Sequence, residues 1–354
     1  MKLVRMSRLA LLSLALALFA PGLAWSQTDA TKRLRIVGGL AGVNQYTRQE
    51  EPFWSRELGK LTGGKVTAEI VPFDRAGIRA QEMLRLMQLG VVPFGTALLG
   101  LTAAQEPAFA APDLAGLSPD LKVVRRATSA FRPYLEKTLR ERYGIELLAI
   151  YVYPAQEIFC NKPLGSLADL AGRRTRTSSP PQSDLIEALG GVPVQTGFAD
   201  IMTNMKSGNI ECAITGTMSG NTIGLPEVTT HLHSMPINWG LSIFGANIGA
   251  WNALSPQLRG TLKQELPKLE NAIWSEAERE TGDGIACNTG SASCVDGRKF
   301  KMVEVKPAPT DDARRRAIFE STVLARWVHR CGAQCAELWN QTIGPVVGTE
   351  ARAK

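Results

Sequence analysis

Residues 172–195 read GRRTRTSSPPQSDLIEALGGVPVQ, and the local pattern changes twice within this stretch. RRTRT predicts an extended segment. Ser179 comes just before Pro180 and Pro181, which is typical of a helix start, and Gly190-Gly191 is typical of a helix end. The closing PVQ is extended again. A strand, a helix and a second strand in this order predict a parallel α/β unit.

The same order of elements is found on both sides of this stretch. Upstream, extended segments at 34–40, 65–73 and 91–99 alternate with helical patterns that end at Gly63-Gly64 and at Gly90. Nearer to it, 144–153 and 209–215 predict strands, 199–208 predicts a helix, and Ser166 is expected to cap a short helix. Two α/β units of similar size predict two hinged lobes with a cleft between them.

These patterns set the expected boundaries. Lobe I covers 27–145, with 233–251 returning to it, and lobe II covers 146–232. Residues 252–354 form a mostly helical bracing segment, in which Pro267 is expected to break or kink the helix. The stretch from about Asp312 to Thr342 predicts a long helix that spans both lobes.

The first 26 residues have the features of a secretory signal. Lys2, Arg5 and Arg8 precede the apolar run LALLSLALALFAPGLA, and small residues follow up to Ser26. We expect cleavage near Ser26 and a periplasmic protein; a signal anchor is the alternative, although the apolar run is short for a membrane span. This segment contains three basic residues and no Asp or Glu, so about +4 of the formal net charge of +7 remains, and the excess is spread along the chain without interleaved aromatic residues. We therefore expect no nucleic-acid partner.

The six cysteines, at 160, 212, 287, 294, 331 and 335, are an even number in an exported chain, which favours disulfides. Cys331 and Cys335 are four residues apart in a helical pattern, so bonds from them to Cys287 or Cys294 are expected in preference to a bond between the two. A zinc site at the last four cysteines is the alternative, but their spacing differs from that of CxxC knuckles.

Motifs for catalysis are missing from the sequence, which has no GxSxG, HExxH, GxGxxG or P-loop. His231 and His233 alternate on an extended segment and could share a metal, but no Asp, Glu or Cys lies close to them in sequence. We expect no enzymatic activity, no metal and no cofactor.

Arg176 is the strongest candidate for a binding residue. It ends its strand just before a helix N-terminus, and open α/β sheets bind ligands at the carboxyl ends of their strands. Its planar guanidinium matches a carboxylate; a solvated surface arginine is the alternative, and Arg173 and Arg174 are expected at the surface. Further cleft residues are expected at strand and helix ends: Asn44, Gln45, Tyr46, Arg79, Gln81, Thr96, Tyr153, Gln156, Thr215, Thr217, Ser219 and Trp239.

The stretch KPLGSLADLAGRRTRTSSPPQSDLIEALGGVPVQTGFADIMTNMKSGNIECAI resembles the second-lobe core of DctP-type solute-binding proteins of tripartite ATP-independent periplasmic (TRAP) transporters. LTGGKVTAEIVPF, LRLMQLGVVPFG and WNALSPQLRGTLKQ also resemble segments of that family, in the same order. The resemblance implies a two-lobe, periplasmic-binding-protein-like α/β fold that closes on an organic acid. It also implies that the membrane subunits of a TRAP permease are the partner and that Arg176 is the arginine that pairs with the ligand's carboxylate.

Two positions depart from the family pattern. Glu157 stands where many members have a second arginine, and Thr215 stands where many have an asparagine. We therefore expect a monocarboxylate, or an acid with a different second group. Two alternative functions use the same scaffold: a protein that presents its ligand to a periplasmic sensor, and an exported enzyme.

Overall fold

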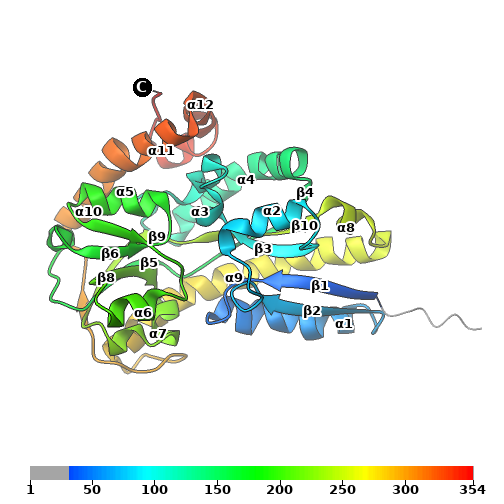
Figure 1. Cartoon of the computed structure of the whole chain (residues 1–354), viewed down its shortest axis with the longest axis horizontal. Coiled ribbons are helices and arrows are strands. Elements are labelled where there is room, and N and C mark those ends of the chain that lie inside the picture. The colour runs from blue at the N-terminus through cyan, green and yellow to red at the C-terminus, as the bar shows by residue number, and fades with distance from the viewer. Residues whose placement is uncertain (1–31, 354) are drawn as a thin grey trace, which may run out of the picture.

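The computed structural model describes residues 32–353, which form two lobes side by side (Figure 1). The signal segment expected at 1–26 lies outside the described residues. Each lobe is built on one sheet. The first has the strand order β2(Val66–Pro72), β1(Lys32–Gly38), β3(Phe94–Leu98), β10(Leu241–Asn247) and β4(Ile145–Val152). The second has the order β11(Val303–Val305), β9(His231–Asn238), β5(Gln156–Cys160), β8(Cys212–Gly216), β6(Arg174–Thr177) and β7(Val192–Gln195).

The first lobe starts with the predicted alternation of strands and helices. β1 pairs in parallel with both β2 and β3. The connections are helical: η1(Gln45–Glu50), η2(Phe53–Glu57) and α1(Leu58–Leu61) lead to β2, and η3(Ala80–Glu82) and α2(Met83–Gln88) lead to β3. α3(Leu99–Thr102), η4(Pro107–Asp113) and α4(Leu121–Tyr143) follow and complete the lobe.

The lobe boundaries differ from the predicted ones. β4, which the sequence placed at the opening of the second lobe, lies in the first sheet and pairs with β10. Gly144, with a φ of +58°, ends α4 and turns the chain directly into β4, so the strand returns beside the sheet that α4 covers. All of β9 lies in the second sheet. The chain therefore crosses between the lobes at 153–155 and at 239–240, instead of at 145 and 233.

The second lobe contains the strand–helix–strand unit at 172–195. β6 and β7 are parallel and are joined by α5(Pro180–Ala188). Ser166 caps η5(Leu167–Leu170) as predicted, because its Oγ accepts a hydrogen bond from the N–H of Ala168 at 3.2 Å. β8 pairs in parallel with β6, whereas β5 is antiparallel to β8 and β9. The remaining helices of this lobe are α6(Ile201–Lys206), α7(Thr217–Thr222) and η6(Leu225–Glu227).

One long helix joins the lobes. After α8(Ile248–Asn252), the 34-residue α9(Pro256–Thr289) runs along both lobes and packs against β4 in the first and α7 in the second (Figure 1). Pro267, expected to break or kink this segment, lies inside the continuous helix on its exposed side, where water can satisfy the carbonyl that loses its N–H partner. None of the helices within 32–353 combines the length and hydrophobicity that a membrane crossing requires.

The carboxy-terminal segment is helical but interrupted. α10(Pro309–Ile318), η7(Phe319–Val323) and α11(Leu324–Cys331) are continuous, and Gly332, with a φ of +97°, separates them from α12(Ala333–Gln341). The single helix predicted over 312–342 is therefore two. η7 packs on α5 of the second lobe, and α13(Gly344–Val347) packs on α4 of the first, so the segment still contacts both lobes.

Three disulfides are present: Cys160–Cys212, Cys287–Cys294 and Cys331–Cys335. Disulfides were predicted, but the preferred pairing of the last four cysteines was wrong. Gly332 ends α11 between Cys331 and Cys335, so the two cysteines do not lie on successive turns of one helix. The first disulfide links the adjacent strands β5 and β8.

Candidate functional site

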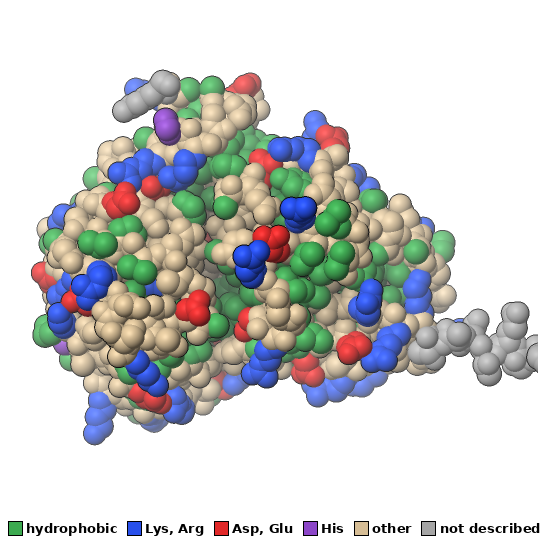
Figure 2. All heavy atoms as spheres, in the orientation of Figure 1, with side chains coloured by type: hydrophobic (Ala, Val, Ile, Leu, Met, Phe, Trp, Pro, Cys, Tyr) green, Lys and Arg blue, Asp and Glu red, His purple; other side chains and the backbone are tan. Residues whose placement is uncertain are grey.

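A cleft of about 440 Å³ lies between the lobes. The surface is hollowed there, and hydrophobic side chains gather at the hollow (Figure 2). The first lobe contributes a mostly apolar wall, which includes Phe73, Ile78, Leu98, Leu101 and Phe109. The second lobe contributes a mostly polar wall, which includes Arg176, Ser178, Ser179, Thr196, Thr215 and Ser219. A cleft with one apolar wall and a few convergent polar groups suits a small organic molecule with a polar head.

Arg176 is the buried cation of this cleft. It is only 3% exposed, and it lies on β6, between the parallel strands β8 and β7. Its Nε donates to the carbonyl of Thr196 at 3.1 Å and its Nη1 donates to the carbonyl of Ile214 at 2.7 Å. These bonds hold the guanidinium plane, while Nη2 donates to none of the residues from 32 to 353.

Burial lowers the pKa of Arg176 to about 10, and the charge of Asp200 opposes this shift. The side chain is therefore still charged at neutral pH. Asp200 is exposed and forms no ion pair with it, nor does any other carboxylate in the described part of the chain. A buried cation without a counter-ion is costly unless an anion completes the site.

The two neighbouring arginines were expected at the surface, and of these Arg174 is exposed whereas Arg173 is half-buried. Arg173 donates to the carbonyls of Lys162 and Pro163, and Arg174 donates to those of Gly208 and Asn209. Both donors lie outside the cleft, and Arg174 is exposed. Of the three arginines at 173–176, only Arg176 therefore reaches the cleft.

Six other predicted residues also line the cleft: Arg79, Gln81, Tyr153, Gln156, Thr215 and Ser219. Gln156 donates through Nε2 to the carbonyls of Pro154 and Trp239, so its side chain is held at the crossing between the lobes. Arg79 is exposed at the mouth and pairs with Glu82 at 3.4 Å. A second guanidinium is thus present at the rim, but it is solvated and paired.

The other six predicted residues lie outside the cleft: Asn44, Gln45, Tyr46, Thr96, Thr217 and Trp239. Gln45 and Thr96 donate to the buried carboxylate of Glu50 at 2.8 and 2.9 Å. Glu50 is fully buried and also accepts from the N–H of Gly39 at 3.1 Å. Burial raises the pKa of Glu50, and the three hydrogen bonds oppose this shift.

The remaining members of this group also bond to the protein. Asn44 donates to Glu280 of α9, and Tyr46 donates to the carbonyl of Ile70. Thr217 donates to the carbonyls of Glu280 and Thr281, and Trp239 donates through Nε1 to the carbonyl of Ser118. Strand ends predict the neighbourhood of the cleft, but a side chain there can turn into the core as easily as towards a ligand.

Asp113, at the end of η4, is a cleft residue that the sequence reasoning missed. Its carboxylate accepts from the N–H groups of Trp239 and Gly240 and from Nδ2 of Asn238. Burial raises the pKa of Asp113 to about 6, against the effect of these three hydrogen bonds. The available signal was a single acid within the apolar stretch at 107–117.

Glu157, at the position where relatives have a second arginine, does not line the cleft. It is 1% exposed, and burial together with the charge of Glu304 raises its pKa well above the usual range. A glutamate side chain supplies no second cation at this position. Thr215, at the other departure, does line the cleft.

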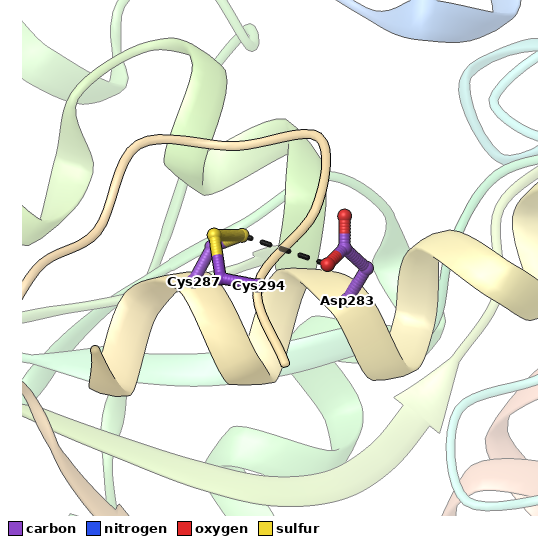
Figure 3. Close-up of side chains that lie close together, drawn as sticks. All are labelled: Asp283, Cys287 and Cys294. Atoms are coloured by element: carbon purple, nitrogen blue, oxygen red, sulfur yellow. Dashed lines mark hydrogen bonds between the residues drawn. A yellow bond between two sulfur atoms is a disulfide. The ribbon is translucent and has the colours of Figure 1, made fainter. Parts of the chain in front are cut away.

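One group in the described part of the chain has the composition of a metal site: Asp283, Cys287 and Cys294 (Figure 3). The two sulfurs form a disulfide and so offer no thiolate ligand. The carboxylate of Asp283 accepts the N–H groups of Val295 and Asp296 at 2.7 and 2.8 Å. This group therefore fixes the loop after α9.

The histidine pair that could share a metal has separate partners. Nε2 of His233, a fully buried residue, lies 3.6 Å from Oδ2 of Asp311. Nδ1 of His231 lies 2.8 Å from the hydroxyl of Thr230. The two rings do not converge on a common site.

Comparison with known proteins agrees with this architecture. Residues 40–286 match the family model described as bacterial extracellular solute-binding protein, family 7 (DctP). DctP7 of Bordetella pertussis, a receptor with bound pyroglutamic acid, is 22% identical, with a TM-score of 0.77 over 88% of this chain and 99% of its own. A TRAP solute-binding protein of Desulfovibrio salexigens with bound orotic acid is 16% identical, with a TM-score of 0.77 over 89% of this chain and 99% of its own.

A third similar structure is a TRAP solute-binding protein of Haemophilus influenzae with bound L-gulonate. It is 14% identical, with a TM-score of 0.76 over 89% of this chain and 99% of its own. At these identities the solved structures support the fold, whereas the family model covers most of the chain directly. The chain belongs to family 7 of the bacterial extracellular solute-binding proteins, the DctP family of TRAP receptors.

Proposed function

We propose that this protein is a periplasmic receptor that captures a compact monocarboxylic acid by closing its lobes and delivers the acid to a TRAP permease. The observation that carries the proposal is Arg176, a buried guanidinium that lines the cleft and whose Nη2 has neither an acceptor nor a counter-ion among the described residues 32–353. A carboxylate placed against that edge would complete the site with charge-assisted hydrogen bonds.

The rest of the ligand would lie against the apolar wall of the first lobe. Closure would bring Phe73, Leu98 and Phe109 over the body of the acid and remove water from around its carboxylate. Binding energy would thus come from both lobes at once, so that the acid is held only in the closed form. No bond is made or broken in this mechanism.

Among residues 32–353, Arg176 is the one buried cation that lines the cleft, which supports a monocarboxylate. Glu157 and Thr215 replace the polar partners that many relatives have, and Arg79 is exposed and already paired. Pyroglutamic and orotic acid, bound by two of the similar structures, each combine one carboxylate with a compact ring, which suits one polar and one apolar wall. They are the first acids to test.

The experiment compares Arg176→Ala with Arg174→Ala, two substitutions on the same strand. Native mass spectrometry of the freshly exported protein would identify the co-purified acid, and calorimetry would measure its affinity. We expect Arg176→Ala to weaken binding at least thirtyfold, since a buried carboxylate without its partner loses about 2–5 kcal/mol, and Arg174→Ala to change it less than twofold. Equal affinity in the two variants would overturn the proposal.

The same preparation tests two further parts of the proposal. The mass of the exported chain should correspond to cleavage near Ser26, and the acid should be recovered chemically intact after incubation. Turnover of the acid would instead favour an enzyme. Capture by the purified permease subunits, and not by a sensor ectodomain, tests the delivery step.

A further inference from the structure

A chain of hydrogen bonds connects the first lobe to the segment that carries Arg176. It begins at Asp113, whose Oδ1 accepts from the N–H of Trp239 at 2.9 Å and whose Oδ2 accepts from the N–H of Gly240 at 2.7 Å. Trp239 and Gly240 are the two residues that join β9 in the second sheet to β10 in the first. One carboxylate of the first lobe therefore holds the crossing between the lobes.

The chain continues into the second lobe through two side-chain amides. Nδ2 of Asn238 donates to Oδ2 of Asp113 at 2.9 Å, and its Oδ1 accepts from Nε2 of Gln182 at 2.7 Å. Oε1 of Gln182 accepts from the N–H of Ser178 at 2.7 Å and from its hydroxyl at 3.1 Å. Asn238 and Gln182 are both buried, and Ser178 lines the cleft two residues after Arg176.

We call this chain of hydrogen bonds, from Asp113 through Asn238 and Gln182 to Ser178, the relay. The direction of each of its bonds follows from which groups can donate and which can accept. The N–H of Ser178 needs an acceptor, so Gln182 must present its oxygen to it and its NH₂ group to Asn238. Asn238 must then present its oxygen to Gln182 and its NH₂ group to position 113. An ionised carboxylate, which only accepts hydrogen bonds, suits that last position and can also accept the two backbone N–H groups.

We propose that Asp113 is a positioning residue that fixes the start of α5, and with it the Arg176 segment, through Asn238 and Gln182. The consequence for ligand capture rests on the function proposed above. The same buried relay would fix both the crossing between the lobes and the position of the carboxylate site. A change in the crossing between the lobes would then shift the guanidinium of Arg176, although Asp113 is on the opposite lobe.

Hydrogen exchange of the full exported chain tests this without any ligand. The first two amides of a peptide do not retain deuterium, and Pro180 and Pro181 have no backbone N–H, so a peptide over 176–182 reports only Ser178, Ser179 and Gln182. Three substitutions interrupt the relay at successive points: Asp113→Leu, Asn238→Leu and Gln182→Met. Each should raise the exchange rate at Ser178 by about tenfold, as loss of one buried hydrogen bond predicts.

Glu50→Gln is the matched control. Glu50 is also a buried carboxylate with three donors in the first lobe, but its hydrogen bonds do not lead to α5. We expect this variant to lose stability and to leave exchange at Ser178 unchanged. Asn238→Leu keeps both hydrogen bonds from backbone N–H groups to Asp113. If Asp113→Leu does not fold, Asn238→Leu therefore shows whether interrupting the relay raises exchange at Ser178.

The proposal is overturned if Gln182→Met alone raises exchange at Ser178 while the substitution at Asn238 leaves it at the wild-type rate. The outcome is independent of the proposed function. Unchanged acid binding in Arg176→Ala would remove the carboxylate site but would not alter the exchange result.

Discussion

Each lobe buries an ionisable side chain, and the two side chains differ in how far the protein satisfies their hydrogen bonds. Glu50 in the first lobe accepts three hydrogen bonds from Gly39, Gln45 and Thr96 and is closed off from the cleft. Arg176 in the second lobe bonds to two carbonyls, lines the cleft and has no counter-ion within 32–353. A buried charge that its own protein satisfies supports the fold, whereas one left incomplete beside a cavity points to a ligand.

The comparison predicts the largest stability loss at Glu50. Glu50→Ala would leave three buried donors without an acceptor, and we expect the free energy of unfolding to fall by about 3 kcal/mol. Urea unfolding of the ligand-free protein measures this. Acid affinity, measured where the variant is folded, should stay within twofold of wild type. If Glu50→Ala kept its stability but no longer bound the acid, Glu50 would be a binding residue and not a residue that supports the fold.

Glu280 of α9 is intermediate between Glu50 and Arg176, because its buried carboxylate is only partly satisfied. It accepts a hydrogen bond from the side chain of Asn44 across the lobes and is otherwise desolvated. Burial raises the pKa of Glu280 from 4.5 to about 7. The folded state therefore binds this proton more tightly than the unfolded state does. The resulting stabilisation is complete below the unfolded value and is lost as the pH rises through about 7.

Replacing Glu280 by glutamine isolates this effect. Between about pH 5 and about pH 8, the free energy of unfolding of the wild type should fall relative to that of Glu280→Gln by on the order of 3 kcal/mol. Urea unfolding at both pH values gives the difference. Parallel pH dependence in the two proteins would show that Glu280 titrates normally in the folded chain.

The smallest expected stability effect is at Arg176 itself. Arg176→Met replaces a buried, incompletely paired cation by an apolar side chain of similar length, at the expense of two hydrogen bonds to carbonyls. We expect the ligand-free variant to unfold within about 1 kcal/mol of wild type, although it should not bind the acid. Calorimetric melting without ligand checks this. If the free energy of unfolding falls as much as in Glu50→Ala, Arg176 supports the fold and is not reserved for a ligand.

Much of the fold could be predicted from the sequence, because turn glycines and helix starts mark its elements. The alternation that begins at β1 and the unit around α5 were predicted correctly. The assignment of β4 was wrong because local pattern identifies a strand but not the sheet that it joins. The pairing of Cys331 with Cys335 was missed because it depends on the single turn at Gly332.

The site was predictable in part for a similar reason. The position of Arg176 followed from its place at a strand end and from the resemblance to relatives. Gln45 follows β1 and Thr96 lies within β3, yet both turn towards a buried carboxylate that sequence alone did not reveal. Asp113 was missed because its partners, at 238–240, are far from it in sequence.

The most direct test of the account is a crystal structure of the exported protein with its co-purified acid. The account predicts closed lobes and a ligand carboxylate oxygen within about 3 Å of a terminal nitrogen of Arg176, with the body of the acid against Phe73 and Phe109. A bound acid whose carboxylate contacts other residues, with the guanidinium of Arg176 left to water, would contradict it.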